Sequence, residues 1–115
     1  MADLEIEVRR DGPYALLALK GEARLEQIDR LRTAVRALIE EGATRVVVGF
    51  KELKFADSAS VGALLELQRA AEAAGGGLAI HGVPTRLARM FEGMGLAARM
   101  KSSPSEAAAR KILAN

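Results

Sequence analysis

The sequence predicts an α/β protein with one mixed, mostly parallel sheet of four or five strands and about four helices. Patterns typical of strands and of helices alternate along the chain, which favours parallel strands joined by right-handed crossovers. Two short strand-like segments open the chain, and a continuously apolar, β-branched run lies in its middle. The 115 residues fit a single domain spanning residues 1–115.

The first two strands are expected to form an N-terminal antiparallel hairpin. Apolar residues alternate with charged ones over residues 4–9, and residues 14–19 form the next apolar run. Between the runs, Asp11, Gly12 and Pro13 are residue types typical of tight turns. Residues 45–50 suit a strand that is covered on both faces, so we expect this strand at the centre of the sheet.

Apolar residues spaced three and four apart predict the helices. The first is expected from Leu25 to the glycine at 42, the second from within residues 57–62 to the glycines at 75–77, and the third from Pro84 to the glycines at 93 and 95. Residues 78–80 are expected to form a short strand, with another around residues 99–101.

The C-terminal helix has a capping-box pattern at its start. Ser103 offers a hydroxyl cap, Pro104 suits the first helical position, and Glu106 stands three residues after the serine. We therefore expect this helix to run from that point through Leu113.

Composition excludes several kinds of site. The chain has no cysteine, so disulfides, thiolate nucleophiles and sulfur-based zinc sites cannot form. Its one histidine, His81, cannot build a histidine metal triad, and we interpret it as a structural or solvent-facing residue. Neither a metal nor a cofactor is expected.

Charge and hydropathy limit the possible partners. A net charge of +2 and 3% aromatic residues give no support for nucleic-acid binding. Apolar residues are dispersed among charges with no run of about 18 residues, and Asp3, Glu5 and Glu7 argue against a signal peptide. The sequence predicts a soluble cytoplasmic protein without direct membrane insertion.

Polar residues gather where the central strand leads into the second helix, a junction at which ligands and partners bind in parallel sheets. One interpretation is that Asp57 or Ser58 simply caps the helix by accepting a bond from a free backbone amide. The other is that Ser58 is phosphorylated, because a helix N-terminus stabilises added negative charge. Because Asp57 lies beside it, the modified site would then present concentrated negative charge to any partner surface.

The segment 53–65 resembles the Asp-Ser-x-Gly-Leu-Gly signature of STAS domains, the family of bacterial anti-sigma factor antagonists, with Asp57 and Ser58 as its first two residues. Gly21 and Glu22 are similar to the family's Gly-Glu after the second strand. Residues 77–84 resemble its fourth strand and following turn, and residues 89–96 its third helix and Gly-Leu ending. The pieces occur in the family's order over nearly the whole chain, so the resemblance implies the STAS fold.

The resemblance implies a non-enzymatic partner switch in which Ser58 is the phosphoacceptor. The unmodified protein would bind an anti-sigma factor that is also an ATP-dependent serine kinase, which frees a sigma factor. Phosphorylation would end the binding, and a metal-dependent serine phosphatase would restore it. Asp57 would either position the Ser58 hydroxyl or contact the kinase.

Three departures from the family pattern bear on the site. Ser60 replaces the first glycine after the serine, which makes it a second candidate acceptor. Arg24 stands where the family's Gly-Glu-Leu-Asp has its aspartate, and residues 49–51 lack the usual aspartate at the end of the third strand. The candidate partner-binding residues are therefore Glu22, Arg24, Asp57, Ser58 and Ser60, with Arg24 either selecting a partner of altered charge or merely flanking the first helix.

Two other functions fit the same residues. The chain could be a STAS subunit of a larger assembly, such as a lipid-transport ABC complex or a stress-signalling scaffold, that binds an ATPase without being phosphorylated. A small hydrolase would need Ser58 as a nucleophile, but only His81 is available to activate it.

Overall fold

A computed structural model describes residues 3–95 and 98–114. The strands form one five-stranded sheet in the order β1-β2-β3-β4-β5, in which β1 is antiparallel to β2 and every other pair is parallel. They are β1 (Glu5–Asp11), β2 (Tyr14–Ala23), β3 (Arg45–Ala56), β4 (Gly77–His81) and β5 (Lys101–Ser103). The predicted mixed sheet, its N-terminal hairpin and the central place of residues 45–50 are confirmed.

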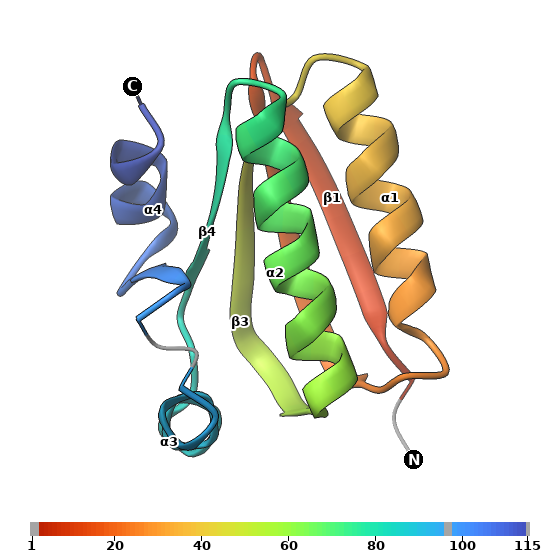
Figure 1. The fold of residues 1–115 in the computed structure, drawn as a ribbon, viewed down its shortest axis with the longest axis vertical. Helices are drawn as coiled ribbons and strands as arrows, with labels where there is room; N and C mark the ends of the chain where they lie inside the picture. The colour runs from red at the N-terminus through yellow and green to blue at the C-terminus, as the bar shows by residue number, and fades with distance from the viewer. Residues whose placement is uncertain (1–2, 96–97, 115) are drawn as a thin grey trace.

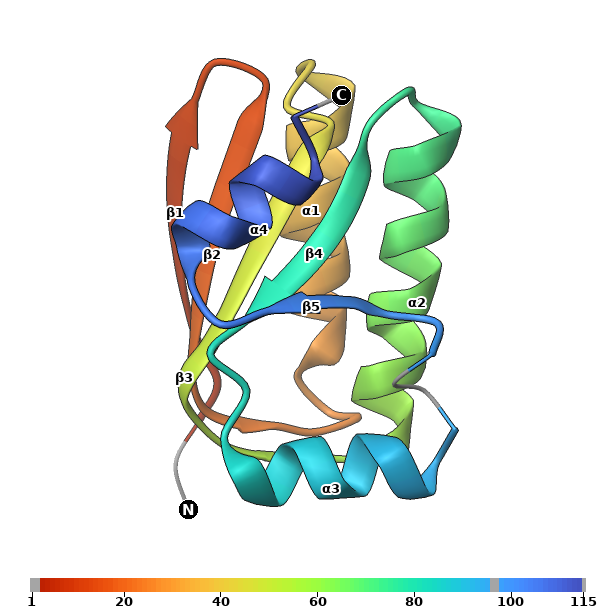
Figure 2. The same cartoon turned by 90° about the vertical axis from the view of Figure 1, so that its left-hand side faces the viewer.

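The helices are α1 (Ile28–Glu40), α2 (Ser58–Ala73), α3 (Thr85–Gly93) and α4 (Glu106–Ile112). Helices α1 and α2 lie side by side on one face of the sheet (Figure 1). Helix α4 lies on the opposite face, and α3 crosses the end of the sheet (Figure 2). Among the described residues, no helix is long and apolar enough to cross a membrane.

The first half of β3 is apolar because both of its faces are covered. Val46, Val48 and Phe50 belong to the main core beneath α1 and α2, whereas Val47 packs with residues of α4 on the other face. The rings of Phe50 and Phe91, the latter from α3, pack in a T-shaped arrangement with a centroid distance of 6.0 Å. Burial on both sides therefore accounts for the unbroken apolar run.

β3 continues six residues beyond the predicted end, to Ala56. Its second half contains Lys51, Glu52 and Lys54, and it stays paired with β2 across two register shifts. All three charged residues are exposed, so their side chains reach solvent without leaving the strand. As a result, Asp57 follows β3 directly instead of after a few intervening residues.

The first helix begins three residues later than predicted. Residues 25–27 form a turn in which the amides of Gln27 and Ile28 donate to the carbonyl of Arg24. Leu25, which was expected on the buried stripe of the helix, is 61% exposed. Its spacing matched the stripe, but the turn aims it away from the core.

The start predicted for α4 is wrong by two residues. Ser103 ends β5, where it pairs with His81, and its hydroxyl donates to the carbonyl of Ser105. Ser105 is the actual N-cap, and its Oγ accepts a bond of 3.1 Å from the amide of Ala108. Strand pairing therefore takes Ser103 away from the capping box, and the short strand lies at 101–103 rather than 99–101. Likewise, Pro84 is the N-cap of α3 and not its first residue.

The revised boundary of α4 predicts different costs for two neighbouring serines. Ser105→Ala should lower the free energy of unfolding by about 1 kcal/mol, because it leaves the Ala108 amide without its cap. Ser103→Ala should cost less than about 0.5 kcal/mol, since its hydroxyl bond is exposed. Urea denaturation of both variants measures the difference, and a larger loss from Ser103→Ala would restore the capping-box boundary.

Candidate functional site

The Asp57 carboxylate joins two segments at the end of the sheet. Asp57 is the N-cap of α2, and its Oδ1 accepts a bond of 2.9 Å from the amide of Ser60. Its Oδ2 accepts a bond of 2.8 Å from the amide of Leu25, in the turn between β2 and α1. The capping interpretation therefore holds for Asp57, and both of its oxygens are engaged within the chain.

Ser60 is part of the interior. Its side chain is fully buried, and its Oγ lies 2.7 Å from Asp57 Oδ1 and 2.8 Å from the carbonyl oxygen of Ala23. Both atoms are acceptors, so the single hydroxyl proton is shared between them. The side chain that replaces the family's glycine thus ties the end of β2 to the start of α2.

Ser58 has the opposite environment. It is the first residue of α2 and is exposed. The amides of Ser58 and Ala59 are in the first helical turn, where no intrahelical carbonyl can accept them. The hydroxyl therefore stands in solvent beside backbone donors and the positive end of the helix dipole.

Arg24 lies at the same end of the sheet. The ends of β2 and β3 are in register, with Glu22 beside Phe55 and Ala23 beside Ala56. The Arg24 Nε donates to Glu22 Oε1 at 3.0 Å, and its guanidinium carbon lies 4.3 Å from the centroid of the Phe55 ring. This cation is thus held by a carboxylate and an aromatic face, with 40% of its side chain still exposed.

All five predicted site residues are brought to one end of the sheet, four at its surface and Ser60 inside it. Sequence reasoning missed Leu25 and Phe55, which add apolar area next to Arg24. For Leu25, the glycine-poor turn after β2 gives no breaker signal that would separate it from the helical stripe.

Hydrogen bonds and charge set the pKa of Asp57. Burial acts to raise this pKa, but the Ser60 hydroxyl, the amides of Ser60 and Leu25, and the charge of Arg24 together hold it below the ordinary value of 3.8. The carboxylate is therefore ionised near neutral pH. Within the described residues, no group of three or more histidine, aspartate or glutamate side chains is placed to hold a metal ion.

A family model described as "Mlab, STAS domain" matches residues 6–101. The chain belongs to the STAS domain family. The resemblance seen in the sequence is thereby confirmed, and the model match covers the whole site. Comparison of this STAS domain with curated proteins gives no match.

Solved structures share the fold of this STAS domain. The anti-sigma factor antagonist SpoIIAA in its unphosphorylated form is 24% identical, with a TM-score of 0.78 and 96% of each chain covered. The Bacillus cell fate determinant SpoIIAA in its phosphorylated form is also 24% identical, with a TM-score of 0.71 and coverage of 96% of this chain and 99% of that one. A putative anti-sigma factor antagonist from Thermotoga maritima is 14% identical, with a TM-score of 0.85 and coverage of 96% and 95%.

The bonds of Asp57 predict a pH-dependent effect of Asp57→Asn. Near neutral pH the variant should lose about 1 to 2 kcal/mol of unfolding free energy, because an amide cannot accept all the bonds that the two carboxylate oxygens accept. The folded-state pKa is lowered, so this stabilisation is complete above the unfolded pKa and disappears as pH falls through the folded value.

Urea denaturation between about pH 7 and pH 3 measures this difference, which should shrink below about pH 4. Asp29→Asn, at a position where the side chain is 84% exposed, is the matched control and should have a smaller effect. A cost of Asp57→Asn that is the same at every pH would contradict the role of the charge.

Proposed function

We propose that this STAS domain is a non-enzymatic, cytoplasmic anti-sigma factor antagonist controlled at Ser58. Its unmodified form binds an anti-sigma factor that is an ATP-dependent serine kinase, and phosphorylation of Ser58 ends that binding. A serine phosphatase returns the protein to its binding form. The observation that carries the proposal is the exposed hydroxyl of Ser58 at the first position of α2.

Burial favours Ser58 over Ser60 as the acceptor. A kinase must reach the hydroxyl, and Ser60 has no exposed surface and lies between two acceptors. Phosphorylation of Ser60 would also place three oxygens in a space closed by the Ala23 carbonyl and the Asp57 carboxylate. The proposal therefore keeps Ser58 as the switch and assigns Ser60 to the structure.

The same geometry explains how a phosphate at Ser58 can act without unfolding the domain. The free amides of the first turn and the helix dipole stabilise the added charge, which is about −1.5 to −2 near neutral pH. At a partner interface this charge must also be desolvated, and Asp57 adds a second negative charge nearby. The added charge therefore destabilises the complex with the partner and not the folded domain.

Similarity to the two SpoIIAA structures supports this function. One is an anti-sigma factor antagonist in its unphosphorylated form, and the other is a cell fate determinant in its phosphorylated form. In this chain, Asp57 and Ser58 stand at the junction between the central strand and the second helix, where the family signature has its Asp-Ser pair.

Substitution at Ser58 tests the switch. Ser58→Ala should bind the cognate kinase as the wild type does and should not be phosphorylated, whereas Ser58→Asp should bind at least about tenfold more weakly because it places charge in the interface. Mass spectrometry after incubation with kinase and ATP, together with titration calorimetry, measures both effects. Ser60→Ala is the matched control and should still be phosphorylated, and modification confined to Ser60, Ser102, Ser103 or Ser105 would refute the assignment.

Arg24 is proposed to select the partner. Its partly exposed guanidinium presents a cation where the family pattern has an acid, so a cognate partner should carry a complementary acidic group. Arg24→Asp should weaken binding at least about fivefold at low salt, with a smaller difference at high salt.

The stability of Arg24→Asp should fall by no more than about 1 kcal/mol through loss of the contacts with Glu22 and Phe55. Arg36→Asp, a charge reversal on α1, controls for net charge. Equal affinities of wild type and Arg24→Asp for the purified partner would refute the role of Arg24 in partner selection.

The second candidate is a STAS subunit of a larger assembly that binds an ATPase without phosphorylation. The departure from the family signature at Ser60, a buried side chain where the pattern has glycine, favours it. In that case the surface around Ser58 would still bind a partner, but incubation with ATP and that partner would leave Ser58 unmodified. The phosphorylation experiment therefore separates the two functions.

A further inference from the structure

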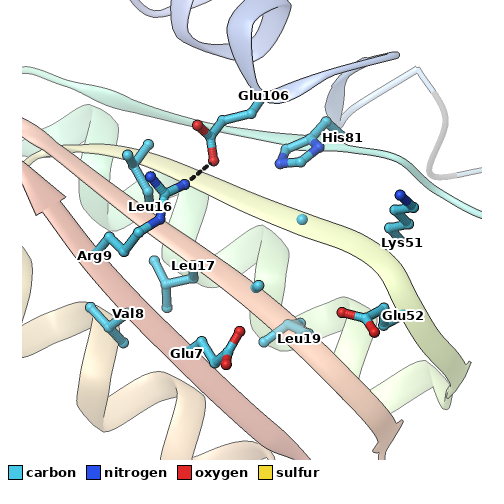
Figure 3. A pocket seen from close by; sticks show the side chains of 12 residues that line it. Glu7, Val8, Arg9, Leu16, Leu17, Leu19, Lys51, Glu52, His81 and Glu106 are labelled. Atoms are coloured by element: carbon cyan, nitrogen blue, oxygen red, sulfur yellow. Dashed lines mark hydrogen bonds and ion pairs between the residues drawn. The ribbon is translucent and has the colours of Figure 1, made fainter.

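The sheet face opposite α1 and α2 is only half covered. Ala109 of the short helix α4 and Leu113, its C-cap residue, pack onto a cluster of Leu16, Val47 and Ala79. Beyond this cluster the same face is hollowed over β1, β2, β3 and β4, with a volume of about 600 Å³ (Figure 3). Sites for small molecules have volumes of about 300 to 1,000 Å³.

Most charged groups around this hollow are paired within the chain. Arg9 of β1 forms an ion pair with Glu106 at the start of α4. Lys20 of β2 lies 3.2 Å from a carboxylate oxygen of Glu7 and 3.5 Å from one of Glu52. The floor between these pairs includes Ala18 and Gly49, which are neighbours across β2 and β3.

The His81 ring enters the hollow because residue 49 is a glycine. A Cβ atom at position 49 would lie 2.9 Å from Cε1 and Nε2 of His81, which is too close for the ring to stay in place. Glycine weakens a strand interior and often marks a close approach of another group. Figure 3 shows the imidazole extending from β4 toward β3, into the space above the sheet.

The His81 nitrogens are available to a ligand. No hydrogen bond joins the ring to any residue within 3–95 or 98–114. Burial lowers the pKa of His81 below 6.5, against the opposing effect of the Glu106 charge. The neutral ring that results has one N–H donor and one acceptor nitrogen.

Lys51 supplies a cation on the same rim. It follows Gly49 by two residues on β3 and is exposed, and its side chain lies beside Gly82, the residue after β4. No carboxylate in the described part of the chain lies within ion-pair distance of its Nζ. Lys51 and His81 are thus the polar groups of this rim that the chain leaves unpaired.

We propose that this hollow binds a small amphipathic anion, with a carboxylate or phosphate held by Lys51 and the His81 N–H and an apolar or planar body against Leu16 and Ala18. The unpaired donors fit an anionic head, and the open floor fits the body. The site lies on the exposed face of the sheet and is separate from the Ser58 hydroxyl at the start of α2. It is therefore independent of the proposed switch.

Nitrogen-15 NMR titration of the full chain tests this site with benzoate and phenyl phosphate, and with benzamide as the uncharged match to benzoate. At least one anion should give saturable chemical-shift changes concentrated in residues 16–20, 47–51 and 79–82. Benzamide should bind with an affinity at least about fivefold lower. Preference between the two anions identifies the head group. Absence of saturable shifts with both anions, or equal binding of benzoate and benzamide, would overturn the proposal.

Variants locate the binding groups. Lys51→Gln should lower the affinity for the preferred anion at least about fivefold. Gly49→Ala should also lower this affinity, because the added Cβ displaces the His81 ring. Lys54→Gln, which removes an exposed lysine three residues along the same strand and outside the hollow, should bind as the wild type does.

Folding of each variant is checked by its amide spectrum, and binding to the kinase partner should be unchanged in Lys51→Gln. Equal anion affinities of wild type and Lys51→Gln would refute the site whether or not the Ser58 switch operates. Conversely, loss of the switch in Ser58→Ala should leave anion binding intact.

Discussion

The Asp57 carboxylate is the interaction on which the geometry at this end of the sheet depends. Its two oxygens hold two separate segments, the turn after β2 through Leu25 and the first turn of α2 through Ser60. Ser60 then extends the same network to the carbonyl of Ala23 at the end of β2. Because these groups are engaged with one another, the neighbouring Ser58 is the serine at this junction that faces solvent.

This network also separates structural from functional roles among adjacent polar residues. An aspartate and two serines within four positions suggest one reactive cluster when seen as sequence. In the fold, Asp57 and Ser60 satisfy backbone groups that would otherwise be buried without partners, at an energetic penalty. Ser58 makes no such contribution and can gain a charge without breaking the network.

Unequal coverage of the sheet creates two distinct surfaces. Two long helices cover one face, whereas the seven residues of α4 cover only part of the other. β3 reflects this difference, because its first half is apolar on both faces and its second half carries exposed charged residues. The Ser58 surface therefore lies at the end of the sheet, while the hollow around His81 lies on its exposed face.

The sequence by itself determined the order of the elements, the hairpin and the central strand. These follow from local periodicity and turn residues, as in the alternation over residues 4–9 and the apolar run at 45–50. It also placed Asp57 and Ser58 at the start of the second helix, because the signature and the helical spacing meet there. Such features depend on neighbours that are close in the chain.

Only the tertiary structure decided where elements end and which side chains are exposed. Pairing with β2 extends β3 to Ala56, and pairing of Ser103 with His81 moves the α4 cap to Ser105. Contacts distant in sequence also bury Ser60 against Ala23 and aim the His81 ring over Gly49. Local pattern cannot encode these outcomes, because each depends on the energy of a pairing between segments that meet only in the folded chain.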